Sequence, residues 1–338
     1  MITKIRYPIS LFVSIIVILT LIFSVPFDSF AKKSSDTVLK KQTQKKKSAS
    51  RKKRSSTPGI QTVSKNPYLG AIVIDANTGE ALFEDNPDAK GYPASMVKMM
   101  NFLIMLEGIE SKRISINDKV RVSAEAAGVG GSQVYLKVNE VFTVDDLLYA
   151  LIIKSANDAA MALALHYTGN KNDFIDLMNK KAQELGMKDT VFRTVNGLPV
   201  GKKPVPDVST PRDMARLSQE LLKHPSALRY TSTQKRLFRA NSRTPMLMRN
   251  HNHLVGNFEG CDGLKTGYFR AAGFSIAATA VKKEERAIAV IFGSVDRNVR
   301  DAKARDLLSI GLSKMLTASS SFPYEKGQRE LLSYSLAK

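Results

Sequence analysis

The chain has 338 residues, 43% of them hydrophobic, enough to bury one large domain or two modest ones. Its net charge of +20 would suit nucleic acid or an anionic surface, but residues 32–54 alone carry eleven Lys or Arg and one acid, half of the total. A single cysteine, Cys261, excludes an internal disulfide and a site built from several cysteines. The four histidines show no HExxH pattern, and the pair His251 and His253 favours a polar loop over a metal site.

The first 31 residues have the pattern of an export signal. Lys4 and Arg6 precede an apolar run over 9–25, and the small residues that end at Ala31 resemble a signal peptidase site. We expect cleavage after Ala31. An uncleaved membrane anchor is the alternative, because the run is slightly long for a signal peptide and slightly short for a spanning helix. Both interpretations send the rest of the chain out of the cytoplasm, to the periplasmic or cell-wall side, so nucleic acid is not expected as a partner.

Residues 32–66 are mostly Lys, Arg, Ser, Thr and Gln, and they contain too few large apolar side chains to order themselves. We expect a disordered basic linker, which either contacts an anionic membrane or cell-wall surface or serves only as a solubilising tether. The folded domain is expected over 67–316. Residues 317–338 form a polar tail that is too short for another domain.

Strand patterns occur at both ends of the folded part, and helical patterns fill its middle. Apolar runs separated by turn residues predict two pairs of strands, 68–75 with 80–84 and 274–281 with 287–294. Helices are expected at 143–153, 159–165, 174–185, 210–222 and 297–316. The economical solution is an α/β (α+β) fold, in which one antiparallel sheet from both chain ends is flanked by helices and carries a helical subdomain.

The stretch 92–100 (YPASMVKMM) places Ser95 and Lys98 three residues apart at the start of an expected buried helix. Pro93 is tolerated at or just before the first helical position, and the residues that follow are apolar nearly all round. Because residues three apart share a helix face, Ser95 Oγ and Lys98 Nζ can meet, and burial can lower the pKa of the lysine until it acts as a base. The spacing alone is a weak signal, since Ser-x-x-Lys recurs in polar parts of the chain.

Two further stretches combine polar residues with apolar flanks. Ser155-Ala156-Asn157 is a short polar break between two apolar helical patterns, a suitable place to hold side chains over a cleft. The same break could cap the second helix. Lys265-Thr266-Gly267 lies in GCDGLKTG, just before the C-terminal strands.

Ser95-x-x-Lys98, Ser155-x-Asn157 and Lys265-Thr266-Gly267, in that order, resemble the three-motif set of the penicillin-recognising serine enzymes. The wider context is similar to one branch, the low-molecular-mass penicillin-binding proteins that are serine D-alanyl-D-alanine carboxypeptidases. The likeness covers roughly residues 67–316. It implies a β-lactamase/transpeptidase-like fold, a peptidoglycan stem peptide as substrate, β-lactam antibiotics as inhibitors, and no metal or other cofactor.

The resemblance also implies roles in acyl transfer. Ser95 would attack the carbonyl between the two terminal D-alanines, and Lys98 would accept its proton. Ser155 would relay a proton to the leaving D-alanine, with Lys265 nearby keeping Lys98 deprotonated. Asn157 would hold Lys98 and hydrogen-bond the substrate's peptide carbonyl. Water would then cleave the acyl-enzyme.

Substrate binding is implied for the third motif. Lys265 and Thr266 would bind the terminal carboxylate, and the backbone N–H groups of Ser95 and Tyr268 would form the oxyanion hole. Gly267 would leave the edge strand open for the substrate to lie along it.

One departure from the family pattern concerns carboxylate binding. The family usually has a second hydroxyl residue two places after the glycine of its Lys-Thr-Gly, and here that place is Phe269. Arg270, the next residue, is a possible replacement for the missing contact. Many members also carry a C-terminal β-domain and an amphipathic helix, for which we see no room after residue 316.

Three other functions use the same motifs. A D,D-endopeptidase acting on peptidoglycan cross-links shares all three. A β-lactamase would need an efficient base for deacylation, and no Glu-x-x-x-Asn-like motif occurs between Ser155 and Lys265. A weakly catalytic wall-binding or penicillin-sensing protein is the non-enzyme alternative, and Phe269 is the only residue that supports it.

Overall fold

A computed structural model describes residues 67–199, 201 and 205–321, with side chains described up to residue 318. The expected export signal, the basic linker and the tail beyond residue 321 lie outside the described residues. Within the described part, none of the helices combines the length and hydrophobicity that spanning a bilayer requires.

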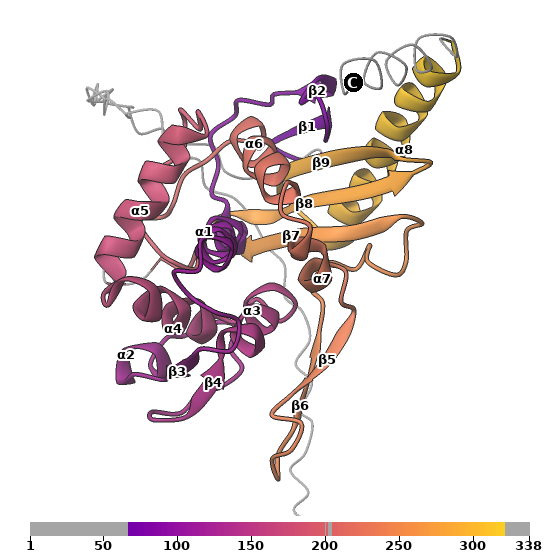
Figure 1. The fold of residues 1–338 in the computed structure, drawn as a ribbon. Coiled ribbons are helices and arrows are strands. Elements are labelled where there is room, and N and C mark those ends of the chain that lie inside the picture. Colours follow the sequence, from indigo (N-terminus) through magenta and orange to yellow (C-terminus); the bar gives the residue numbers. More distant parts are fainter. Residues whose placement is uncertain (1–66, 200, 202–204, 322–338) are drawn as a thin grey trace, which may run out of the picture. The chain divides into compact units, whose positions relative to one another are not determined.

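A five-stranded sheet with the order β2-β1-β9-β8-β7 forms the centre of the domain, and all neighbouring strands are antiparallel (Figure 1). The strands are β1 (Gly70–Asp75), β2 (Ala81–Asp85), β7 (Cys261–Phe269), β8 (Gly273–Lys282) and β9 (Glu285–Ser294). The first described strand therefore pairs with the last. This confirms the prediction of one antiparallel sheet made from both ends of the folded part.

The turn between β8 and β9 is shorter than the sequence suggested. Strands β8 and β9 extend into the charged residues 282–286, which the sequence pattern left between the two predicted strands, and Lys282 pairs with Glu285. Only Lys283 and Glu284 remain to make the turn, and both have positive φ, at 50° and 66°. Two-residue hairpin turns with this geometry match the twist of the flanking strands, so the chain tolerates left-handed backbone at two non-glycine residues.

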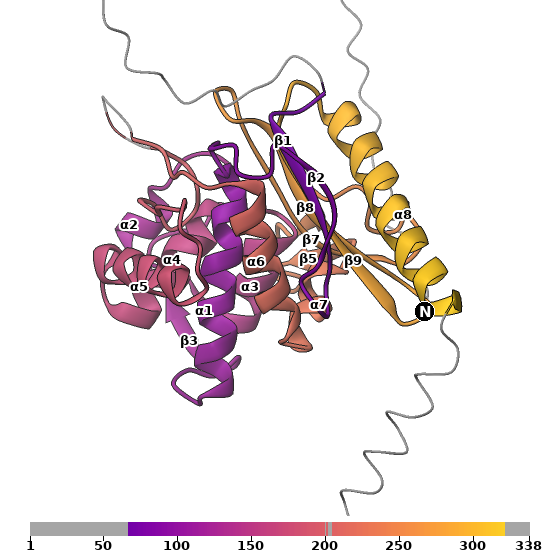
Figure 2. The ribbon, with the colours of Figure 1, turned by 90° about the horizontal axis from the view of Figure 1, so that it is seen from above.

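The two faces of the sheet are covered differently (Figure 2). Helix α8 (Arg297–Ser321) packs on one face, and α1 (Lys98–Glu110) and α6 (Pro211–Leu222) lie on the other. Alternation along β1 separates two hydrophobic cores: Ile72 and Ile74 face the helical side, and Ala71 and Val73 face α8. Helix α1 lies between the sheet and the other helices, which explains why its sequence is apolar nearly all round.

The helical subdomain is built around α1. Its other elements are α2 (Ala124–Ala127), α3 (Val144–Ile152), α4 (Asn157–Thr168), α5 (Lys171–Glu184) and the short strands β3 (Lys119–Arg121) and β4 (Val141–Thr143). The Thr143 side chain accepts a hydrogen bond from the Asp146 N–H and caps α3, as expected. The sequence did not predict α2, β3 or β4, nor α7 (Ser226–Thr231) and the hairpin of β5 (Lys235–Phe238) and β6 (Met246–Arg249).

Truncating Leu308 should destabilise the core under α8. Its side chain is fully buried against the sheet, so Leu308→Ala removes apolar contacts and leaves a cavity. We expect a loss of about 2–5 kcal/mol in the free energy of unfolding, measured by chemical denaturation. Ile310→Ala, at a position 42% exposed on the same helix, should cost far less. Equal losses would contradict the assignment of a core beneath α8.

Candidate active site

Ser95 and Lys98 lie at the start of the central helix, as expected. A short 3₁₀ helix, η1 (Ala94–Val97), begins after Pro93 and continues directly into α1 at Lys98. Residues three apart eclipse one another in a 3₁₀ turn, and Lys98 Nζ accordingly lies 3.0 Å from Ser95 Oγ. Lys98 is fully buried, whereas Ser95 is partly exposed.

The second motif reaches Lys98 from the turn between α3 and α4. Asn157, the first residue of α4, accepts a hydrogen bond from Lys98 Nζ through Oδ1 (2.7 Å) and donates one from Nδ2 to the Gly130 carbonyl (2.8 Å). Ser155 has a positive φ of 59°, and its buried Oγ has no hydrogen-bond partner among the described residues. The capping alternative is wrong, because Ala156 occupies the cap position and no side chain caps the helix.

The third motif lies on β7, at the edge of the sheet. The added Cβ of any other residue at Gly267 would lie 2.3 Å from the Pro93 carbonyl oxygen, so glycine lets β7 pass against the turn that carries Ser95. This close approach is a different reason for glycine from the one that the resemblance implied. Thr266 and Tyr268 face a cavity, whereas Phe269 stacks on Tyr92 with ring centroids 5.8 Å apart.

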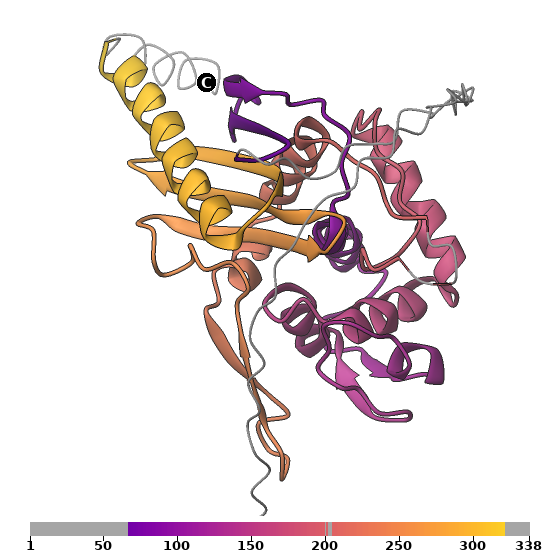
Figure 3. The same ribbon diagram turned by 180° about the vertical axis from the view of Figure 1, so that it is seen from behind.

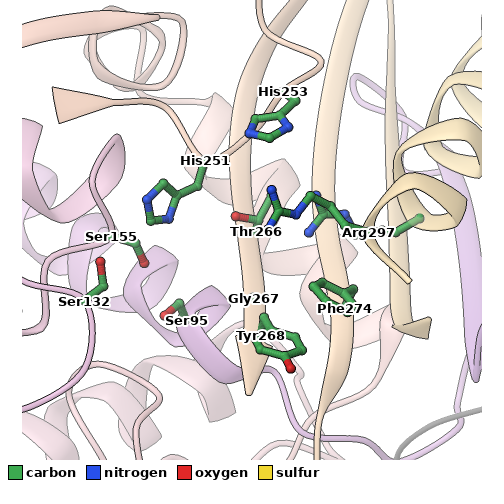
Figure 4. Close-up of a pocket in the computed structure, with 11 residues that line it drawn as sticks. Ser95, Ser132, Ser155, His251, His253, Thr266, Gly267, Tyr268, Phe274 and Arg297 are labelled. Carbon is green, nitrogen blue, oxygen red and sulfur yellow. The ribbon is translucent and has the colours of Figure 1, made fainter. Parts of the chain in front are cut away.

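A cavity of about 540 Å³ brings the three motifs together (Figure 4). Its lining residues are Ser95, Ser132, Ser155, His251, His253, Thr266, Gly267, Tyr268, Phe274, Arg297 and Arg300. Ser95 and Ser155 lie on one side of β7, and Arg297 lies on the other, towards α8 (Figure 4). Lys98, Asn157 and Lys265 are buried and do not line the cavity surface themselves.

Six of the lining residues were not identified from the sequence as site residues. Ser132, Phe274, Arg297 and Arg300 belong to no motif, and His251 and His253 were expected only in a polar loop. The loop is present, and both imidazoles reach the cavity from it. The described residues contain no cluster of three or more His, Cys, Asp or Glu side chains placed to hold a metal ion. Arg270 is exposed and is not among the lining residues.

Burial sets the protonation of the two lysines. It lowers the pKa of Lys98 well below its ordinary value, and the positive charge of Lys265 lowers it further, while Asp207 and Asp158 oppose the shift. Burial, and then the charge of Arg300, lowers the pKa of Lys265 to about 7. Both amines therefore lose their protons more readily than an ordinary lysine, and that of Lys265 titrates near pH 7.

Hydrogen-bond stoichiometry orients the amine of Lys98. Besides Ser95 Oγ, Nζ contacts Asn157 Oδ1 and the main-chain carbonyl oxygen of Asn196, at 2.7 and 2.6 Å. Both of these atoms can only accept. A neutral amine has two N–H groups and one lone pair, so donating to both acceptors leaves the lone pair directed at Ser95 Oγ. Lys98 is thus arranged to take a proton from Ser95.

The Asn196 carbonyl is held in place by a buried carboxylate. Asp207 accepts hydrogen bonds from the N–H groups of Arg193 and Thr194 and from Thr194 Oγ1, at 2.6, 2.9 and 2.7 Å. Thr194 Oγ1 in turn accepts from the Gly197 N–H at 2.7 Å. Asp207 therefore ties down the turn that presents the Asn196 carbonyl to Lys98.

Asp207→Asn should disturb this turn and the basicity of Lys98 together. The new amide N–H₂ would replace an acceptor with a donor opposite groups that are already donors, at an expected cost of about 1–3 kcal/mol in stability. Because the carboxylate raises the pKa of Lys98, its loss should lower that pKa and move the acid limb of Ser95 acylation to lower pH. Stopped-flow acylation across pH 5–9 measures this limb. If it lies at the same pH as in the unmodified protein, Asp207 does not raise the pKa of Lys98.

Comparison with known proteins identifies the family. Residues 57–296 match the sequence model of peptidase family S11, described as D-alanyl-D-alanine carboxypeptidase. The chain is 37% identical over 247 residues to the D-alanyl-D-alanine carboxypeptidase DacF of Bacillus subtilis, covering 73% of this chain and 62% of that protein. It is 29% identical over 252 residues to a D-alanyl-D-alanine endopeptidase of Escherichia coli, covering 73% and 78%.

Solved structures of penicillin-binding proteins are similar to this chain in fold and sequence. Penicillin-binding protein D2 of Listeria monocytogenes, in its ampicillin-bound form, has a TM-score of 0.64 and 30% identity, covering 72% of this chain and 96% of that one. Penicillin-binding protein 5 of Haemophilus influenzae has a TM-score of 0.68 and 30% identity, covering 73% and 71%. The chain spans about 60–63% of the length of the curated carboxypeptidases it matches. With these matches and three motifs around one cavity, the chain belongs to the D-alanyl-D-alanine carboxypeptidase family.

Proposed function

We propose that this protein is a serine D-alanyl-D-alanine carboxypeptidase that removes the terminal D-alanine of peptidoglycan stem pentapeptides through an acyl-enzyme on Ser95. The observation that carries the proposal is the buried Lys98, whose pKa is lowered and whose Nζ lies 3.0 Å from Ser95 Oγ while its other two partners, Asn157 Oδ1 and the Asn196 carbonyl, can only accept. A serine hydroxyl is a weak nucleophile until a base takes its proton, and Lys98 is placed to be that base.

The reaction then follows from the neighbouring groups. Ser95 Oγ bonds to the carbonyl carbon of the penultimate D-alanine as its proton passes to Lys98, and the backbone N–H groups of Ser95 and Tyr268 stabilise the oxyanion. The carbon–nitrogen bond breaks, and a proton relayed through Ser155 leaves with the terminal D-alanine. The unpartnered Ser155 Oγ at the cavity supports this relay. Water then attacks the ester, and Ser95 recovers its proton.

Cationic side chains at the cavity provide a binding site for the terminal carboxylate of the substrate. Phe269 is not among the residues that line this cavity. Arg300 is largely engaged, since Nε and Nη2 both donate to Asp301 Oδ1, at 2.9 and 2.6 Å. Arg297 is exposed, lines the cavity, and has no ion pair with any described carboxylate. We infer that Arg297 assists Thr266 and Lys265 in binding the terminal carboxylate, in place of the missing hydroxyl.

Arg297→Ala should weaken this carboxylate site selectively. Loss of a charge-assisted contact is worth roughly 1.5–3 kcal/mol, so we expect KM for a pentapeptide ending in D-Ala-D-Ala to rise about 10- to 100-fold. Hydrolysis of the same peptide with a C-terminal amide should change little. A parallel rise for both substrates would mean that Arg297 only supports the structure.

We also propose that the protein binds β-lactams and that it acts outside the cytoplasm. The Listeria relative was crystallised with ampicillin bound, and the same Ser-x-x-Lys arrangement here should be acylated by penicillins. We propose that the first 31 residues export the protein to the periplasmic or cell-wall side, where its substrate lies. The basic linker at 32–66 would then contact an anionic membrane or wall surface.

The test of the function is release of D-alanine from a D-Ala-D-Ala pentapeptide by the full chain, with Ser95→Ala as the control and labelled penicillin in parallel. Serine-dependent release together with acylation is the expected result. Acylation without release would favour the D,D-endopeptidase alternative, which the match to the Escherichia coli endopeptidase makes worth testing on cross-linked muropeptides. It would equally fit a weakly catalytic penicillin-binding protein. Absence of both signals would overturn the proposal.

A further inference from the structure

The β5–β6 hairpin has one buried and one exposed face. Phe238 and Met248 point inwards and are buried. The outward-facing side chains form two cross-strand pairs, Leu237 with Leu247 and Lys235 with Arg249. The hairpin extends away from the central sheet, so this outer face is not covered by another described element (Figure 1).

Neither outward pair is favourable if this face of the hairpin contacts only water. Leu237 is 52% exposed and Leu247 is 46% exposed, side by side across the two strands. Like charges placed directly opposite one another destabilise a pair of strands, and neither Lys235 nor Arg249 forms an ion pair with a described carboxylate. The stretch from residue 232 to 258 contains no Asp or Glu at all. An apolar and anionic partner would stabilise both pairs.

The exposed surface continues beyond the hairpin. Arg239, just after β5, donates to the carbonyl oxygens of Val134 and Tyr135, at 2.7 and 3.0 Å, and thereby holds the hairpin against the segment before β4. The exposed apolar side chains there are Tyr135 and Val138 in that segment and Val141 at the start of β4. Both parts lie at the same end of the domain (Figures 1 and 3).

The nearby carboxylates do not neutralise this end of the domain. Glu140 is paired with Arg239, and Asp145 is paired with Arg229 and contacts Arg236. Lys137, Lys235 and Arg249 are exposed and have no described ion pair. The unpaired charges of this end are therefore positive, and Lys235 and Arg249 lie next to the exposed leucines on the same face of the hairpin.

We propose that the outer face of the β5–β6 hairpin, together with Tyr135, Val138 and Val141, binds the surface of an anionic phospholipid bilayer. A bilayer fits better than a soluble polyanion because it can accept the leucines into its apolar boundary while its headgroups pair with Lys235 and Arg249. Each such cation strengthens binding to an anionic leaflet only about fivefold, so the contact is weak alone and orients a protein that is also held elsewhere.

The chain contains no tryptophan, so Leu247→Trp gives the full-length protein a single indole fluorophore on this face. We expect its emission to shift to the blue, and to be quenched by brominated acyl chains, in vesicles of phosphatidylglycerol with phosphatidylcholine. Ile310→Trp is the matched control, since Ile310 is 42% exposed on α8. That probe should show neither change.

A charge variant tests the headgroup contact. Lys235→Gln with Arg249→Gln, in the Leu247→Trp protein, should remove most of the quenching, and pure phosphatidylcholine should do the same. The proposal is overturned if the Leu247→Trp protein sediments with vesicles while its indole stays unquenched, because other segments would then hold it. Equal quenching of the Ile310→Trp probe, or a shift with poly(glycerol phosphate) but none with vesicles, would also overturn it. Unchanged penicillin acylation by Ser95 verifies that each variant is folded.

Discussion

Lys98→Met is expected to slow acylation of Ser95 by roughly 10²–10⁴-fold, the range for loss of a general base. The physical reason is that Lys98 Nζ lies 3.0 Å from Ser95 Oγ and that its other two partners, Asn157 Oδ1 and the Asn196 carbonyl, can only accept, so a neutral amine would keep its lone pair for Ser95. Methionine is an unbranched side chain of similar length but cannot accept a proton. Stopped-flow measurement of acylation by a labelled penicillin gives the rate directly and does not depend on turnover of a peptide.

The stability of the Lys98→Met protein separates chemistry from folding. The substitution removes a buried amine, which favours folding, but it leaves two buried acceptors without a donor, at about 1–3 kcal/mol each. We therefore expect a small net change in the melting temperature. An acylation rate within threefold of the unmodified protein would show that another group takes the proton from Ser95.

Lys265→Met should make the protein less active and more stable at low pH. The pKa of Lys265 is lowered from 10.5 to about 7 by burial and by Arg300. Between these two values the unfolded chain binds more protons than the folded one, so the free energy of unfolding rises with pH from about 7 towards 10.5. Below pH 7 the folded protein must bury a charged amine at full cost. Methionine removes that cost and, with it, this part of the pH dependence.

Thermal unfolding at pH 6 and pH 9 tests this directly. The Lys265→Met protein should melt at a higher temperature than the unmodified protein at pH 6, and the difference should narrow at pH 9. The same variant loses a charge that lowers the pKa of Lys98, so the acid limb of acylation should move to higher pH. Lys283→Met, on an exposed turn of the same sheet, is the control and should alter neither property. A lower melting temperature for Lys265→Met at pH 6 would contradict the argument.

Much of the fold could be predicted because its signals are local. Residues Thr210 and Thr143 cap helices at the positions that the sequence indicated, and the apolar runs of β1 and β9 report strands buried on both faces. The β5–β6 hairpin was missed because each strand has four residues and mixes arginine or lysine with apolar side chains. These short strands are stabilised by the packing of Phe238 and Met248 rather than by the intrinsic β-strand propensity of their residues.

The sequence by itself determined the family, the antiparallel sheet made from both chain ends, and the contact of Ser95 with Lys98, which needs only a spacing of three on one helical turn. Only the tertiary structure decided what surrounds that pair. Lys98 meets Asn157 and the Asn196 carbonyl across 59 and 98 residues of chain. Arg297 enters the cavity from the last helix. Contacts over such separations leave no periodicity in the sequence, and a main-chain carbonyl has no residue type to recognise, so these parts of the site become visible only when the chain is folded.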